Sequence, residues 1–175
     1  LAQTLGASGE PRRMHRALVF VASAVGAIYV LWLGGQLPET VASHFGPSGK
    51  ADSFMPRAVF VPLMCLLTAG VPLLSWWMQT RAISRGKAKI PNASHWFAES
   101  RRAQTERFLL GHAALFSVVL TAFLCYVYWL VFAANVASPG PAVLGTTPFL
   151  VGTGAFLVVL AGWAAALQLR FRRGA

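Results

Sequence analysis

The sequence predicts an all-α, polytopic membrane protein with four transmembrane helices and both termini in the cytoplasm. The chain of 175 residues is 56% hydrophobic and only 11% charged, which is unlike an ordinary soluble domain. Four long apolar runs lack Asp, Glu, Lys and Arg once their first and last turns are set aside. Because about 20 helical residues cross a bilayer core of about 30 Å, each run can span a membrane. The runs cover residues 15–37, 58–78, 108–134 and 149–169.

The distribution of basic residues predicts the orientation. Thirteen of the fifteen Lys and Arg residues lie in three segments, around the start of the first run, between the second and third, and after the fourth. They are Arg12, Arg13 and Arg16; Arg81, Arg85, Lys87, Lys89, Arg101, Arg102 and Arg107; and Arg170, Arg172 and Arg173. Cytoplasmic loops of membrane proteins are enriched in such residues. We therefore expect a bacterial cytoplasmic (inner) membrane protein whose basic segments contact anionic lipid headgroups rather than nucleic acid.

We expect the four runs and their connections to form a single four-helix membrane domain that comprises residues 1–175. The first fourteen residues are expected to be a short disordered lead. In the second run, Pro62 and Pro72 each remove a backbone hydrogen bond, which predicts a kinked or locally rewound helix. Residues 98–108 carry charges at helical spacing, so we expect a charged helix that continues directly into the third run.

Two outer loops are expected, at residues 38–57 and 135–148, and one cytoplasmic loop at residues 79–107. The first outer loop is rich in glycine and proline and is expected to be a structured, non-helical, turn-rich segment. The second outer loop has no charged residue. It can lie either against the membrane surface or against the first outer loop.

The first outer loop also carries a motif. Leu37 and Pro38 are followed by His44-Phe45, then by Gly49 and Asp52. This pattern resembles the signature of a bacterial membrane family of unknown function, a domain that also forms the N-terminal part of Sdp-type immunity proteins. Such proteins protect a cell from its own killing factor. Ala42 stands where the family usually has a proline, and the resemblance implies little about chemistry.

A second segment extends the resemblance, which covers roughly residues 31–107. Pro91 and Asn92 precede Trp96, and Arg101 and Arg102 follow, as in the segment after the second helix of that family. Asn92 suits a turn or a helix cap. We expect Trp96 to lie at the headgroup level and the two arginines to reach phosphates or a cytoplasmic partner.

His44 and Asp52 are the first candidates for a binding site. They can pin the loop through a hydrogen bond, recognise a partner or peptide, or bind a divalent cation. A metal site usually needs three or four ligands, and only Glu39 is nearby as a third. We therefore predict no metal and no cofactor, with His44 and Asp52 as weak metal candidates.

His112 lies about one turn inside the third run, and an intramembrane histidine marks a potential functional site. A haem between helices would need a second histidine, and His15 is the one at a similar depth. A neutral, hydrogen-bonded His112 is the simpler expectation.

No acidic residue lies within the runs, and no Ser-His-Asp, Walker, dinucleotide or HExxH pattern is present. We therefore expect a non-enzymatic membrane protein that acts by binding, as an accessory or stabilising subunit of a larger membrane complex with other membrane chains. An immunity-type or sensory protein that recognises an extracytoplasmic peptide is the alternative. A small transporter or channel is a second alternative.

Overall fold

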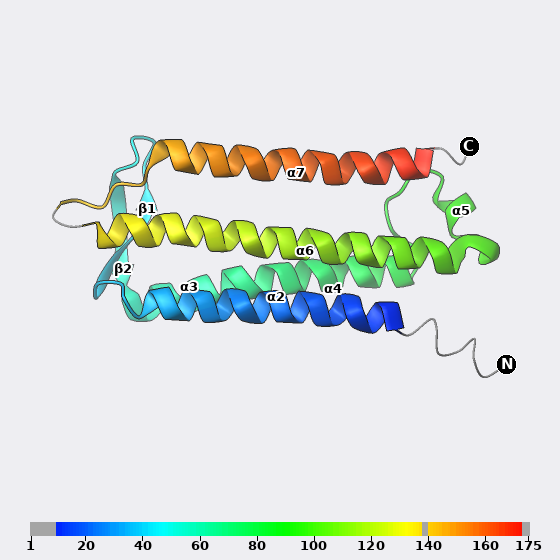
Figure 1. Ribbon diagram of the computed structural model, residues 1–175, viewed down its shortest axis with the longest axis horizontal. Coiled ribbons are helices and arrows are strands. Elements are labelled where there is room, and N and C mark those ends of the chain that lie inside the picture. The colour runs from blue at the N-terminus through cyan, green and yellow to red at the C-terminus, as the bar shows by residue number, and fades with distance from the viewer. Residues whose placement is uncertain (1–9, 138–139, 173–175) are drawn as a thin grey trace.

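Four long helical segments lie side by side and form the body of the protein (Figure 1). The computed structural model describes residues 10–137 and 140–172. Each segment is long and apolar enough to cross a membrane, which confirms the predicted four-helix, multi-pass fold. The segments are α2 (Glu10–Gly34); α3 (Arg57–Cys65), η1 (Leu66–Gly70) and α4 (Val71–Ser84) in succession; α6 (Glu99–Val136); and α7 (Thr146–Arg172).

The helix ends differ from the apolar runs by several residues. Helix α2 begins at Glu10, so residues 10–14 of the expected lead are already helical, and residues 1–9 lie outside the described residues. It ends at Gly34 rather than at residue 37, and Gly35 and Gln36 form a turn after it. The charged segment before the third run is continuous with it in α6, as predicted. The apolar runs indicate which residues can lie in the hydrocarbon core of a membrane. The helix ends are instead set by local backbone conformation, so the two sets of bounds differ.

The prolines of the second segment rewind the helix as expected. Between Pro62 and Pro72 the backbone forms one π-helical turn, η1. A proline has no N–H to complete the α-helical ladder, and a π turn is one way to absorb that gap. The carbonyl oxygen of Pro72, near the start of α4, accepts a hydrogen bond from the Ser117 hydroxyl at 3.2 Å. This bond joins the start of α4, directly after the rewound turn, to α6.

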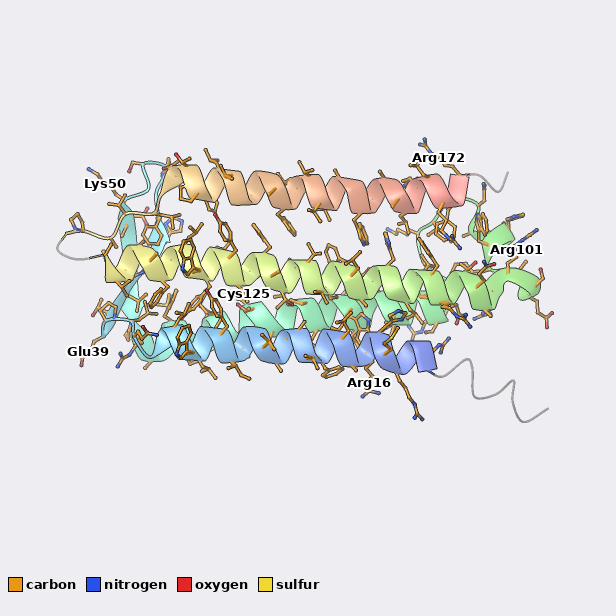
Figure 2. The ribbon with its side chains drawn as sticks, viewed as in Figure 1. Arg16, Glu39, Lys50, Arg101, Cys125 and Arg172 are labelled. Atoms are coloured by element: carbon orange, nitrogen blue, oxygen red, sulfur yellow. The ribbon has the colours of Figure 1, made fainter. Side chains whose placement is uncertain are left out.

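The two ends of the bundle differ in charge (Figure 2). Arg16, Arg101 and Arg172 lie at one end, which we call the basic end, and Glu39 and Lys50 lie at the other. The start of α2, the end of α4, the start of α6 and the end of α7 all lie at the basic end. Arg173 lies outside the described residues. The three basic segments identified from the sequence therefore share one end of the bundle.

The first outer loop is a β-hairpin, although no strands were predicted there from the sequence. Strands β1 (Thr40–Phe45) and β2 (Ala51–Pro56) pair antiparallel. The expectation of a structured, non-helical loop holds, but its hydrogen bonding is that of a sheet. Only β1 buries consecutive residues, Val41 and Ala42, while most of β2 is exposed. The end of the bundle that carries these strands is called the hairpin end.

The core is divided along the bundle axis. At the hairpin end, Tyr128 stacks on Phe60 and donates its hydroxyl to the carbonyl oxygen of Val30 at 3.1 Å. At the basic end, Phe171 of α7 packs with Ile83 and Leu109. Between the two clusters, buried Gly26 lets α2 approach Thr121 of α6 closely.

Helix α7 lies along α6, on the side away from α2, and its last turn also packs against Ile83 of α4 (Figure 1). Phe156 stacks on Phe123 at 4.1 Å, and Gly152 faces the ring of Tyr126. A cavity of about 320 Å³ lies between the two helices beside His112 and Trp163. The most apolar part of α7 buries none of its residues, in contrast to α2. Helix α7 thus has one face on α6 and one face that no described residue covers.

Candidate functional site

The hairpin places His44 and Asp52 together on an exposed edge. His44 Nδ1 lies 2.6 Å from Asp52 Oδ1, and the two side chains are 69% and 51% exposed. The strand register shifts on both sides of His44, and such irregularities re-aim side chains. The two motif residues predicted from the sequence therefore form an exposed, hydrogen-bonded pair.

The turn of the hairpin explains why the motif contains glycine. Gly46 donates its N–H to Lys50 O at 2.9 Å, and Gly49 donates its own to Gly46 O at 2.9 Å. Gly49 has φ of +77°, a conformation that residues with a side chain rarely adopt. Phe45 is half-buried at the end of β1, and Pro38 is exposed between α2 and β1. The motif residues thus shape the hairpin more than they line a cavity.

The second outer segment packs against the hairpin rather than lying apart from it. Lys50 and Val143 form an isolated antiparallel bridge. Ala51 N–H donates to Ala142 O at 3.1 Å, and Leu144 N–H donates to Gly49 O at 2.8 Å. Of the two positions left open for this segment, contact with the first outer loop is the one observed. The two segments together form an outer cap, defined by residues 40–56 and 142–144.

Asn135, at the end of α6, fastens the cap to the bundle and was not singled out from the sequence. Its side-chain oxygen accepts the Ala42 N–H at 2.7 Å, and its Nδ2 donates to Ala42 O at 3.0 Å. Nδ2 also donates to Val131 O at 2.9 Å. A lone amide directly after a long apolar run is the only sequence signal that could have indicated this role.

Replacing Asn135 by leucine should loosen the cap while leaving the four helices in place. Two hydrogen bonds to Ala42 would be lost, each worth about 1 kcal/mol, so the Ala42 amide should exchange about 30-fold faster with deuterium. Hydrogen exchange of the purified protein measures this. Gln36→Leu is the matched control, because the Gln36 side-chain amide, in the turn after α2, donates to Trp32 O and makes no bond to the cap within the described residues. Equal protection of Ala42 in both variants would show that Asn135 does not hold the cap.

The outer cap has no cluster of three metal ligands. Glu39 precedes β1 at the base of the hairpin, while His44 and Asp52 lie near its turn. Over residues 10–137 and 140–172, no three His, Cys, Asp or Glu side chains come together as a metal site would require. A pair alone is too few ligands for most protein metal sites.

The second motif folds into a short helix at the basic end. Asn92 adopts the left-handed conformation, with φ of +52°, after Pro91 and before α5 (Ala93–Trp96). The Asn92 carbonyl oxygen accepts hydrogen bonds from the N–H groups of His95 and Trp96. The motif thus makes a sharp turn that leads into α6.

Trp96 joins this turn to the end of α7. Its indole N–H donates to Phe171 O at 3.1 Å, and the two rings meet edge to face at 5.3 Å. Thr105 donates its hydroxyl to Trp96 O at 2.9 Å. The expected contact of Trp96 with lipid headgroups stays a prediction, but its polar group is already used within the protein.

Arg101 and Arg102 differ in their surroundings. Arg101 is exposed and lies 3.5 Å from His95 Nδ1. Arg102 donates to Ser84 O at 3.1 Å and to Glu106 Oε1 at 2.9 Å. Glu106 also pairs with Arg12, and its side chain is only 11% exposed. This glutamate links α2 to α6, a role that its helical spacing in the sequence did not reveal.

His15 and His112 lie on different faces of α6. His15 Nε2 would be 3.2 Å from a side-chain carbon built on Gly111, so it packs on the α2 side. The His112 ring stacks on Trp163 of α7 at 4.4 Å. Trp163 donates its indole N–H to His112 O at 3.0 Å. His15 therefore contacts α6 at Gly111, whereas the His112 ring packs against α7.

Comparison with known proteins adds one finding. A family model described as a domain of unknown function, DUF1648, matches residues 18–69. The matched segment contains most of α2, the whole hairpin with His44 and Asp52, and the second span up to η1. The motif at residues 90–107 lies beyond it.

No curated protein matches the chain, and no solved structure matches it. The matched segment is less than half of the chain, and its description assigns no activity. The exposed His44–Asp52 pair lies within this segment, and beyond it Trp96 and Arg102 make hydrogen bonds to α7 and to Ser84 at the end of α4. The chain is thus a four-helix, membrane-type protein with a DUF1648-like segment at residues 18–69.

Proposed function

We propose that the protein is a non-catalytic, stabilising subunit of a larger membrane assembly and that α7 contacts a neighbouring chain. The observation that carries the proposal is the isolation of α7. It packs along α6, and no residue in its most apolar stretch is fully buried within the protein. A helix held on one side only gains most from a second neighbour, because membrane helices associate by van der Waals packing.

The open face of α7 suits a close helix contact. Gly154, Val158, Ala161 and Ala165 follow at steps of four, three and four residues, so they lie on one side of the helix. All four are exposed, and a side chain built on Gly154 meets nothing within 4 Å in the described residues. Small residues at this spacing let another transmembrane helix approach closely.

The hairpin end supports a binding role more than a catalytic one. Its exposed histidine and aspartate are paired with each other, and the hairpin that carries them is fixed through Asn135. A rigid cap of this kind is suited to contact with another protein surface. In the proposed orientation, the basic end faces the bacterial cytoplasm and the cap faces outward, following the positive-inside rule.

Co-purification tests the proposed role. The tagged chain is isolated from its natural host in mild detergent, and accompanying membrane chains are identified by mass spectrometry at a fixed ratio. Ala161→Leu with Ala165→Leu should lower partner recovery about tenfold, because a helix contact worth about 1–2 kcal/mol is lost.

The matched control places the same two substitutions at Ala24 and Ala122, which are exposed on α2 and α6. Partner recovery should stay at the level of the unsubstituted chain. Isolation of the chain without any stoichiometric partner, or equal recovery in both double variants, would contradict the proposal.

A second candidate is recognition of an extracytoplasmic peptide by the cap, as in an immunity-type or sensory protein. It is favoured by the exposed His44–Asp52 pair on a rigid hairpin. In that case the chain is isolated alone, and His44→Ala with Asp52→Ala lowers survival of peptide-challenged cells. Solute flux into liposomes above the empty-vesicle background would instead favour a transporter or channel.

A further inference from the structure

A cavity at the basic end has the composition of an anion site. It has a volume of about 280 Å³ and lies where α2, α4 and α6 meet. Three arginines line it, Arg12 and Arg16 from α2 and Arg81 from α4, against one carboxylate, Glu106. The lining therefore has an excess of two positive charges. Figure 2 shows Arg16 at this end of the bundle.

Two of the three arginines are available to a ligand. Arg12 pairs with Glu106. Within residues 10–137 and 140–172, neither the Arg16 guanidinium nor the Arg81 guanidinium has a carboxylate partner or donates a hydrogen bond. Each guanidinium instead lies over an aromatic ring: Arg16 is 5.5 Å from the Phe20 centroid, and Arg81 is 4.4 Å from that of Trp77. Stacking of this kind holds a guanidinium in place while leaving its N–H donors free.

Two further cavity residues hold polar atoms without a partner. The indole Nε1 of Trp76 and Nδ1 of His15 are buried and make no hydrogen bond with the described residues. Buried polar atoms are nearly always paired in folded proteins. Trp76 Nε1 can only donate, so the missing partner is an acceptor. A ligand that carries oxygen acceptors and negative charge would satisfy both the indole and the arginines.

The surroundings of the cavity are amphipathic. Phe20 and Trp77, which lie beneath the two arginines, are each 48% exposed on the apolar surface of the bundle. Aromatic residues beside basic residues are typical of the membrane–water interface. The volume is close to the lower limit for small-ligand pockets, about 300 Å³, so it suits a headgroup and not a whole lipid.

We infer that this cavity binds a phosphate-bearing anion, with Arg16 and Arg81 as the charged ligands and the Trp76 indole as a neutral donor. The phosphate belongs either to an anionic phospholipid, whose acyl chains would lie along Phe20 and Trp77, or to a soluble phosphate compound. The site is separate from the α7 face and from the outer cap, so it does not depend on the proposed function.

Native mass spectrometry of the delipidated full chain, titrated with phosphatidylglycerol, tests this inference. Arg16→Gln with Arg81→Gln should weaken binding at least about tenfold, because two charge-assisted hydrogen bonds are lost. The control is Arg13→Gln with Arg85→Gln, which removes the same charge from α2 and from the residue that follows α4, both outside the cavity lining. Its affinity should fall less than about threefold, as expected for screened surface charges.

Two further measurements separate the outcomes. Trp76→Phe keeps the ring but removes the N–H, and it should weaken binding about fivefold, the value of one hydrogen bond. Millimolar inorganic phosphate that displaces phosphatidylglycerol identifies a soluble phosphate as the ligand, and failure to displace it identifies the lipid headgroup. Equal weakening in the two arginine double variants, or equal binding of phosphatidylcholine and phosphatidylglycerol, would overturn the inference.

Discussion

Replacing Gly26 by leucine should destabilise the helix bundle by about 3 kcal/mol, at the upper end of typical overpacking costs. A side-chain carbon built on Gly26 would lie 2.9 Å from Thr121 Cγ2 and 3.2 Å from Thr68 Cγ2. Neither methyl group can move easily, since threonine is stiff at χ1 and both residues are buried. The Thr121 hydroxyl is also bonded to Ser117 O at 2.9 Å. Thermal unfolding, followed by the fluorescence of the six tryptophans, measures the loss.

Gly154→Leu is the control for this substitution. It introduces the same side chain into a transmembrane helix, but at a position where nothing lies within 4 Å in the described residues. The stability of the isolated chain should change by less than about 0.5 kcal/mol, as for other surface substitutions. Similar losses in the two variants would mean that helix packing at Gly26 is not the cause.

The helices could be predicted because hydrocarbon imposes a simple requirement on the sequence. A span needs about 20 residues without charge, and four such runs were visible. The rewinding of the second span was also predictable, since Pro62 and Pro72 each lack the N–H of an α-helical bond. The clustering of arginines at one end follows from the even number of spans, which returns the chain to the side from which it started.

The outer hairpin could not be predicted with the same ease. An amphipathic strand is recognised by alternating apolar and polar residues, but most of β2 is exposed and its burial does not alternate. The strand exists because its backbone pairs with β1 and because Ala51 and Gly49 pair with the second outer segment. Backbone pairing between segments about 90 residues apart leaves no periodic signal in either one.

Glu106 and Trp96 show the same limit at the basic end. Helical spacing placed Glu106 beside Arg102, yet its second partner, Arg12, comes from another helix. Trp96 was expected at the lipid headgroups, and its indole N–H is donated to the last turn of α7. Both contacts depend on which helices lie next to each other. That arrangement is set by side-chain packing, which cannot be read from a single sequence.

Replacing Gly49 by alanine should detach the second outer segment from the hairpin. Gly49 has φ of +77°, which costs a residue with a side chain about 1–2 kcal/mol. The new methyl group would also lie 2.6 Å from Leu144 O. This oxygen belongs to the backbone of the residue whose N–H bonds to Gly49 O, so relief of the clash must displace the paired segment. We expect a total local cost of about 3 kcal/mol once the clash is included.

Hydrogen exchange separates this effect from a general loss of stability. The amides of Ala51 and Leu144 bridge the two outer segments, and a cost of about 3 kcal/mol should speed their exchange at least about 100-fold. Amides within α2 and α6 should keep their protection, because the helices do not depend on the cap. Gly140→Ala is the matched control, since a methyl group there meets nothing within 4 Å in the described residues. If the Ala51 and Leu144 amides exchanged at the same rate in the two alanine variants, Gly49 would not be the residue that holds the two outer segments together.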